Sequence, residues 1–228
     1  MNDTGALLAH NSGRIKFGPD GFLYAVVGEH TNPANAQIIN GNTNLAGKVL
    51  RLGPTGAIPA DNPFPGSWIW AHGIRNSFGF TFDPANNNLW LTDNGPDCND
   101  EVDRIVKGGN YAWGSAQTCT TPPAAPQNTN QDGPQPRLLP QLFYPDAKGI
   151  TGAAFCSSCQ LGLNGMLLIG DVVNGEIHGL TLDASRTSVV ADQLLYDHPR
   201  GIQSMETRPG QPIYFSDSGG IYRLTPFG

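Results

Sequence analysis

The amino-acid sequence predicts an all-β fold of the β-propeller type, and three observations support this prediction. Charged residues make up only 14% of the 228-residue chain, while 29 glycines and 19 prolines supply many turns, a mixture typical of short strands joined by turns. No segment has the periodicity of a long amphipathic helix. A hairpin followed by a third strand recurs four times along the chain, which is the pattern of propeller blades.

The repeats are located by their turn residues; in the first, Asp20-Gly21 separates two apolar segments and predicts a β-hairpin. The expected strands lie at 14–17, 22–27 and 48–52; 78–82, 89–92 and 101–105; 152–155, 166–170 and 176–180; and 202–207, 212–216 and 220–224. A β-sandwich also contains short strands and turns, but the constant order within each repeat favours a propeller. We therefore expect a single propeller domain over residues 1–228 with about four blades.

One long insert interrupts this pattern at residues 115–149. It is rich in proline, glutamine, asparagine and threonine and shows no periodicity. Such a segment predicts a surface loop within the domain and not a linker between domains.

Composition argues against several classes of partner. The net charge is −6 and no basic run occurs, so neither nucleic acid nor an anionic membrane surface is an expected partner. No apolar run approaches the roughly 18 residues that span a bilayer. Residues 1–8 lack the basic start and the apolar stretch of a signal peptide.

The four cysteines leave three interpretations open. Cys98 and Cys119 flank a loop-rich segment and could form a bridge, and Cys156 and Cys159 have a Cys-x-x-Cys spacing. Two disulfides in an oxidising compartment, free thiols, and a metal site all remain possible at this point.

The most informative motif is the hairpin at 78–92 with the residues that flank it. Arg75-Asn76 precedes its first strand, and Asn94-Gly95-Pro96 follows its second strand. A fixed guanidinium suits an anionic ligand, and exposed backbone carbonyls suit a hard metal ion. An acidic cluster follows at 97–103, for which a solvated loop and a calcium region are the two interpretations.

Several motifs together resemble the soluble sugar dehydrogenases that use pyrroloquinoline quinone, the glucose/sorbosone dehydrogenase family. They occupy residues 10–15, 18–21, 36–37, 47–51, 58–64, 72–76, 94–96, 100–101 and 108–113. The match is dense over 10–114 and looser over 150–228. The resemblance implies a six-bladed propeller of which the first one or two blades are missing from this chain.

The resemblance also implies roles for residues of the first half of the chain. His10 would be the general base that accepts the proton of the sugar hydroxyl, and the backbone carbonyls of Gly95 and Pro96 would bind Ca²⁺. Arg75 would be catalytic as well as cofactor-binding, because its charge would stabilise the carbonyl that accepts the hydride. The remaining implied site residues are Asn76, which with Arg75 would hold the quinone; Gln37, which would line the same cavity; Asn94, a further cofactor-binding residue; and Asp100, Glu101 and Tyr111, near a second calcium region. Chemically, base, metal and guanidinium together suit removal of a hydride and a proton from a sugar.

The second half departs from the family pattern. Val173 stands where the family has a lysine, and Gly201 and Gln203 stand where it has two arginines. A quinone with three carboxylates needs several cations in its site. Lys148 and Arg200 are the only apparent replacements, so Arg200 is included as a cofactor-binding candidate.

The expected function is oxidation of a sugar C1 hydroxyl to the lactone, with Ca²⁺ and pyrroloquinoline quinone as cofactors. Two alternatives stay open: a non-catalytic, calcium-stabilised propeller that binds a carbohydrate or a protein, and a calcium-dependent lactonase. A periplasmic or extracellular location is expected. Unpaired strand edges in an incomplete propeller predict self-association or cover by further chain.

Overall fold

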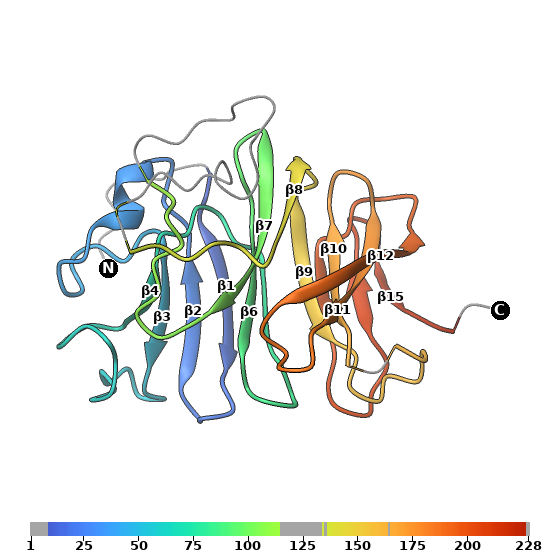
Figure 1. Ribbon diagram of the computed structural model, residues 1–228, viewed down its shortest axis with the longest axis horizontal. Helices are drawn as coiled ribbons and strands as arrows, with labels where there is room; N and C mark the ends of the chain where they lie inside the picture. Colours follow the sequence, from blue (N-terminus) through green and yellow to red (C-terminus); the bar gives the residue numbers. More distant parts are fainter. Residues whose placement is uncertain (1–8, 115–133, 135, 164, 227–228) are drawn as a thin grey trace. The chain divides into compact units, whose positions relative to one another are not determined.

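The fold is described by a computed structural model for residues 9–114, 134, 136–163 and 165–226 (Figure 1). These residues form fifteen β-strands and one short 3₁₀ helix. Contacts along the chain divide it into two compact units. Unit 1 comprises Met1–Ser77 and Val106–Leu139, and unit 2 comprises Phe78–Ile105 and Pro140–Gly228.

Unit 1 contains one four-stranded antiparallel sheet in the order β1-β2-β3-β4. Its elements are β1 (Ser12–Phe17), β2 (Leu23–Val27), the 3₁₀ helix η1 (Pro33–Gln37), β3 (Lys48–Leu52) and β4 (Ile69–His72). Asp20 fixes the first hairpin because it accepts hydrogen bonds from the Phe22 amide at 3.2 Å and from Arg51 Nε at 2.9 Å. The sheet buries Leu50 and Ile69 with Leu45 in a small core.

Unit 2 contains three antiparallel sheets, each in chain order. The first consists of β5 (Gly79–Phe82), β6 (Leu89–Asp93), β7 (Cys98–Ile105) and β8 (Leu142–Asp146). The second consists of β9 (Ile150–Phe155), β10 (Leu167–Asp171), β11 (Glu176–Leu182) and β12 (Val189–Asp197), and the third of β13 (Ser204–Glu206), β14 (Tyr214–Ser216) and β15 (Ile221–Arg223). Each sheet is thus a simple meander of the kind that forms a propeller blade.

Within unit 2, the first strands of successive sheets pack against one another. β9 contacts both β5 and β13, and all six residues of β9 are buried. Gly152 permits this close approach, because a Cβ at that position would lie 2.5 Å from Met205 Cγ on β13. Two apolar clusters fill the unit: one surrounds Trp90 and Ile169, and the other surrounds Leu168 and Phe215.

All twelve predicted strands have a counterpart in the structure, but β4, β8 and β12 were not expected. Each of these is the last strand of its sheet. β8 carries Pro145, which is tolerated at a sheet edge because a missing amide costs no ladder bond there. β8 also lies inside the 115–149 segment that was expected to be loop throughout, so residues 142–146 of that segment form a strand. Residues 115–133 of the segment lie outside the described residues.

The cysteine alternatives are resolved for one pair. Cys156 and Cys159 form a disulfide, so the free-thiol and metal interpretations were wrong for them. Cys98 is also disulfide-bonded, while Cys119, its expected partner, lies outside the described residues. Across the described part of the chain, none of the helices has the length and hydropathy that crossing a bilayer requires.

Candidate functional site

In unit 1, the register of the first hairpin places His10 beside Glu29. Ser12 pairs with Val27, so the segment before β1 and the segment after β2 run side by side. The His30 amide donates to the His10 carbonyl at 3.2 Å. His10 Nδ1 is hydrogen-bonded to Glu29 Oε1. The Glu29 side chain is 1% exposed and that of His10 is 20% exposed. The result is a buried carboxylate that holds a partly accessible imidazole.

Residues 28–30 lie between His10 on one side and Arg75 on the other. The Arg75 carbonyl accepts the Glu29 amide at 2.8 Å, and the Arg75 guanidinium lies over the ring of Trp113, with Cζ 5.2 Å from the ring centroid. Gly28 separates His10 from Arg75: a Cβ there would overlap the His10 carbonyl oxygen and lie 3.0 Å from the Arg75 carbonyl oxygen. The structure therefore brings the backbones of His10 and Arg75 to the two sides of Gly28, with Asn76 next to Arg75 in the chain.

Gln37 is fixed at the end of η1 by two hydrogen bonds. Its Nε2 donates to Asn110 Oδ1 at 2.9 Å and to the Trp113 carbonyl at 2.6 Å. Tyr111 lies between these two partners in the chain, and its hydroxyl accepts the Val106 amide at 2.8 Å. Gln37 and Arg75 thus share Trp113 as a neighbour, whereas the Tyr111 side chain stabilises its own turn.

Lys48 is fully buried and is hydrogen-bonded to the backbone of η1. Its ammonium donates to the carbonyls of Asn35 at 2.7 Å, Ala36 at 3.2 Å and Ala46 at 2.7 Å. Burial lowers the pKa of Lys48 to about 7, a shift that the three carbonyls oppose because they stabilise the charged form. Burial and the charge of Lys48 lower the pKa of the neighbouring His72 to about 4.

In unit 2, Asp100 fixes the Gly95–Pro96 segment. The carboxylate is 1% exposed and accepts three backbone amides: Gly95 at 2.8 Å, Lys148 at 2.8 Å and Gly149 at 2.6 Å. One buried anion therefore ties the loop after β6 to the turn before β9. Asn94 adds a second link between these elements, because its Nδ2 donates to the Ile150 carbonyl at 3.1 Å.

The acidic cluster is mostly inside the protein. Asp97 is exposed, but Asp100, Glu101 and Asp103 are 1%, 5% and 1% exposed. The solvated-loop interpretation was therefore wrong for three of its four members. Burial, together with nearby Asp93, raises the pKa of Asp103 well above its ordinary value.

The two candidate replacement cations of unit 2 both face carboxylates. Lys148 Nζ lies 2.6 Å from Glu176 Oε2, and Arg200 Nη1 lies 3.6 Å from Asp217 Oδ2. Asp217 also accepts His198 Nε2 at 3.0 Å and the Gly219 amide at 2.6 Å. Each cation is therefore already partly neutralised by the protein.

Replacing Asp217 by Asn should remove part of the acid sensitivity of the fold. Burial raises the pKa of Asp217, but hydrogen bonds from His198 and two backbone amides outweigh it, and the net pKa falls from 3.8 to about 2. A depressed pKa contributes stability above about pH 4, which is lost as the pH falls toward 2. Urea unfolding at pH 7 and pH 3 should show a smaller difference for D217N than for wild type. D197N, which changes an exposed carboxylate, is the control, and an equal acid loss in all three proteins would contradict the assignment.

The predicted site residues thus divide between the units. His10, Gln37, Arg75, Asn76 and Tyr111 belong to unit 1. Asn94, Gly95, Pro96, Asp100, Glu101 and Arg200 belong to unit 2. Glu29 and Lys48 were missed as positioning residues. Counting back from the Asp20-Gly21 turn pairs position 10 with position 29 or 30, so the sequence did carry a signal for Glu29.

The sheets and their strand order define a protein of the β-propeller class. A model of the family described as Glucose / Sorbosone dehydrogenase matches residues 3–223, so the chain belongs to that family. The chain is 29% identical over 237 residues to the aldose sugar dehydrogenase YliI of Escherichia coli K12, covering 95% of this chain and 60% of the relative.

Solved structures agree with this assignment. A glucose dehydrogenase structure matches 96% of this chain and 64% of its own, with a TM-score of 0.81 and 26% identity. The PQQ-bound aldose sugar dehydrogenase of Streptomyces coelicolor matches 92% of this chain and 57% of its own, with a TM-score of 0.74 and 25% identity. The chain therefore spans about 60% of the length of the E. coli relative.

Proposed function

We propose that this protein is a quinone-dependent oxidoreductase that oxidises the C1 hydroxyl of an aldose to the lactone. The observation that carries the proposal is the His10–Glu29 pair held beside Arg75 in a member of the Glucose / Sorbosone dehydrogenase family. That a relative has been solved with PQQ bound supports the choice of cofactor.

His10 serves as the base in this proposal. Glu29 engages Nδ1, which orients the ring and leaves Nε2 to accept a proton from a substrate hydroxyl. The partial exposure of His10 gives a sugar access to that nitrogen. Arg75, stacked on Trp113, provides a fixed positive charge for an anionic ligand or for developing negative charge.

Calcium would be held in unit 2 by the Gly95 and Pro96 carbonyls. A hard cation prefers such oxygen ligands, and Asp100 fixes the peptide that carries them. Glu101, which is buried on β7, remains a proposed contributor to a second calcium region in unit 2.

Pyrroloquinoline quinone, when bound, would supply the hydride acceptor. The fit of unit 2 to its three carboxylates is incomplete, because Lys148 and Arg200 already face carboxylates and Val173 is exposed in place of a lysine. In unit 1, the side chains of Arg75 and Asn76 carry donors for an anionic group, whereas both hydrogens of Gln37 Nε2 are already donated to Asn110 and Trp113.

The proposal is tested by adding Ca²⁺ and then pyrroloquinoline quinone to the purified protein, and by assaying dye reduction with aldoses. A saturable change in quinone absorbance together with aldose-dependent dye reduction is expected. Absence of a spectral change at micromolar quinone would favour the second candidate, a calcium-stabilised binding propeller. The ion pairs that occupy Lys148 and Arg200 are the observation that favours this alternative.

Self-association is also proposed, because apolar residues lie exposed on an edge strand of unit 1. Ile15 is 66% and Phe17 is 60% exposed on β1, which ends its sheet, and such edges invite pairing. Light scattering should give a mass above the 24.3 kDa of one chain, and F17K should reduce it. A wild-type mass of one chain at all concentrations would contradict the proposal.

The disulfide between Cys156 and Cys159 favours a periplasmic or extracellular location for the protein.

A further inference from the structure

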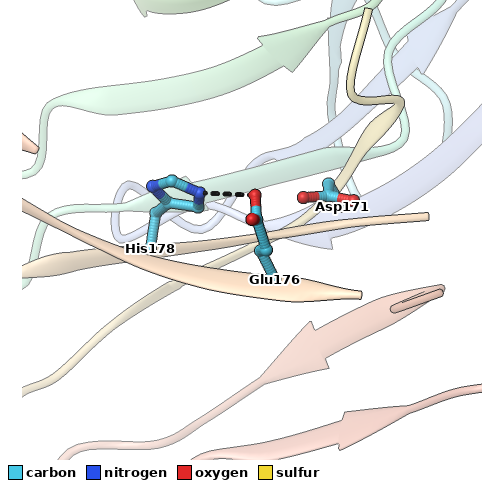
Figure 2. A group of neighbouring side chains, drawn as sticks. All are labelled: Asp171, Glu176 and His178. Atoms are coloured by element: carbon cyan, nitrogen blue, oxygen red, sulfur yellow. Dashed lines mark hydrogen bonds and ion pairs between the residues drawn. The ribbon is translucent and has the colours of Figure 1, made fainter. Parts of the chain in front are cut away.

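Three side chains of the β10–β11 hairpin form a compact group of possible metal ligands (Figure 2). Asp171 ends β10, Glu176 begins β11 and His178 follows two residues later. Glu176 and His178 share one face of the strand because side chains alternate with a period of two. One ligand atom from each of the three residues lies within 4.8 Å of the other two.

Asp171 is the buried member of the group, and its carboxylate is only half satisfied. The residue is 1% exposed, and its Oδ1 accepts the amides of Asn174 at 2.6 Å and Gly175 at 3.1 Å. Its Oδ2 is buried and has no hydrogen-bond partner among the described residues. Figure 2 shows one carboxylate oxygen of Asp171 facing Glu176. A buried oxygen without a partner is costly, and a bound cation would satisfy it.

His178 is held in the orientation that metal-binding histidines adopt. Its Nδ1 is hydrogen-bonded to Asp192 Oδ1 at 2.8 Å, and Asp192 Oδ2 accepts the Tyr144 hydroxyl at 2.9 Å. The other ring nitrogen, Nε2, lies 3.2 Å from Glu176 Oε2 and faces the carboxylates. A carboxylate behind one nitrogen and a ligand position before the other is the usual outer shell of a metal-bound imidazole.

We propose that Asp171, Glu176 and His178 bind a divalent transition-metal ion, with Zn²⁺ the best match. One imidazole and two carboxylates suit zinc better than calcium, which prefers oxygen ligands alone. Tetrahedral bonds of about 2.0–2.2 Å require ligand atoms about 3.3 Å apart, so the group must contract slightly. Glu176, with its side chain 24% exposed, has the freedom to move.

Lys148 is the competitor for this site. Its ammonium lies 2.6 Å from Glu176 Oε2 and compensates part of the negative charge in the absence of a metal. A metal ion can use that oxygen fully only if Lys148 withdraws, since two cations in contact repel each other. Removing the ammonium should therefore strengthen metal binding, whereas removing any ligand should weaken it.

The test is a titration of the full chain with Co²⁺, followed by visible absorbance, in a buffer saturated with Ca²⁺ to occupy sites for hard cations. Wild type should bind one equivalent, and Zn²⁺ should displace it. H178Q and D171N should bind at least about 10-fold more weakly, and D192N about 10- to 100-fold more weakly. K148M should bind more tightly than wild type. H198Q, which alters another buried histidine paired with an aspartate, should bind as wild type.

Three results would each overturn the proposal. The first is no ligand-field absorbance from wild type at millimolar Co²⁺. The second is equal affinity in wild type, H178Q and D171N. The third is a K148M protein that loses thermal stability without binding metal more tightly, which would make Lys148 the sole counter-ion of the group. Should D171N fail to fold, as judged by circular dichroism, H178Q and K148M decide the question.

Discussion

Replacing His10 by Gln should lower kcat for aldose oxidation by about 10²- to 10⁴-fold, the usual contribution of a positioned general base. Glutamine can still hydrogen-bond to Glu29, but it cannot accept the hydroxyl proton. Quinone binding, followed by absorbance, should change little, because in the proposed function the imidazole acts on the sugar and not on the cofactor. Glu29→Gln should lower kcat by a smaller factor, since it disturbs only the orientation of His10.

His30→Gln is the matched control for this prediction. His30 follows Glu29 in the chain, and its amide donates to the His10 carbonyl, but its side chain has no proposed role. Steady-state rates and quinone titrations of all four proteins separate catalysis from binding. If H10Q and H30Q reduced the rate equally, or if H10Q only raised KM, His10 would not be the base.

Replacing Asp100 by Ala should cost at least about 3 kcal/mol of unfolding free energy. The change leaves the amides of Gly95, Lys148 and Gly149 without their buried acceptor, and each unsatisfied amide carries a penalty of about 1–3 kcal/mol. Because the Gly95 amide is released, the Gly95–Pro96 carbonyls should lose their fixed orientation. We therefore expect weaker Ca²⁺ binding in addition to lower stability.

Urea unfolding and calcium titration of D100A, compared with D97N, test this prediction. Asp97 is an exposed carboxylate of the same loop, so D97N removes one negative charge without removing the anchor. Equal stability of the two variants would show that Asp100 does not hold the loop. Reduced stability with unchanged calcium affinity would separate the anchor from the metal site.

The first three strands of each sheet could be predicted because their signals are local. Asp20-Gly21 and the apolar segments on either side of it specify a hairpin without reference to the rest of the chain. The fourth strands carry no such signal. β12 is exposed along most of its length, and β8 contains a proline, so their pairing follows from the sheet that is already formed and not from their own residues.

The candidate site was predictable where it depends on chain order and not where it depends on side-chain partners. The approach of His10 to the residues after β2 follows from hairpin register. The ion pairs of Lys148 with Glu176 and of Arg200 with Asp217 join residues of separate segments. The carboxylate that pairs with a given lysine or arginine is decided by the folded structure. The sequence therefore suggested Lys148 and Arg200 as replacement cations, although each already pairs with a carboxylate of the protein.

Gly28 has a consequence for any attempt to alter this protein by mutation. The close approach of the His10 and Arg75 backbones depends on the missing side chain of Gly28, since even a methyl group at position 28 would collide with the His10 carbonyl. Any side chain at position 28 should therefore displace the segment that carries His10.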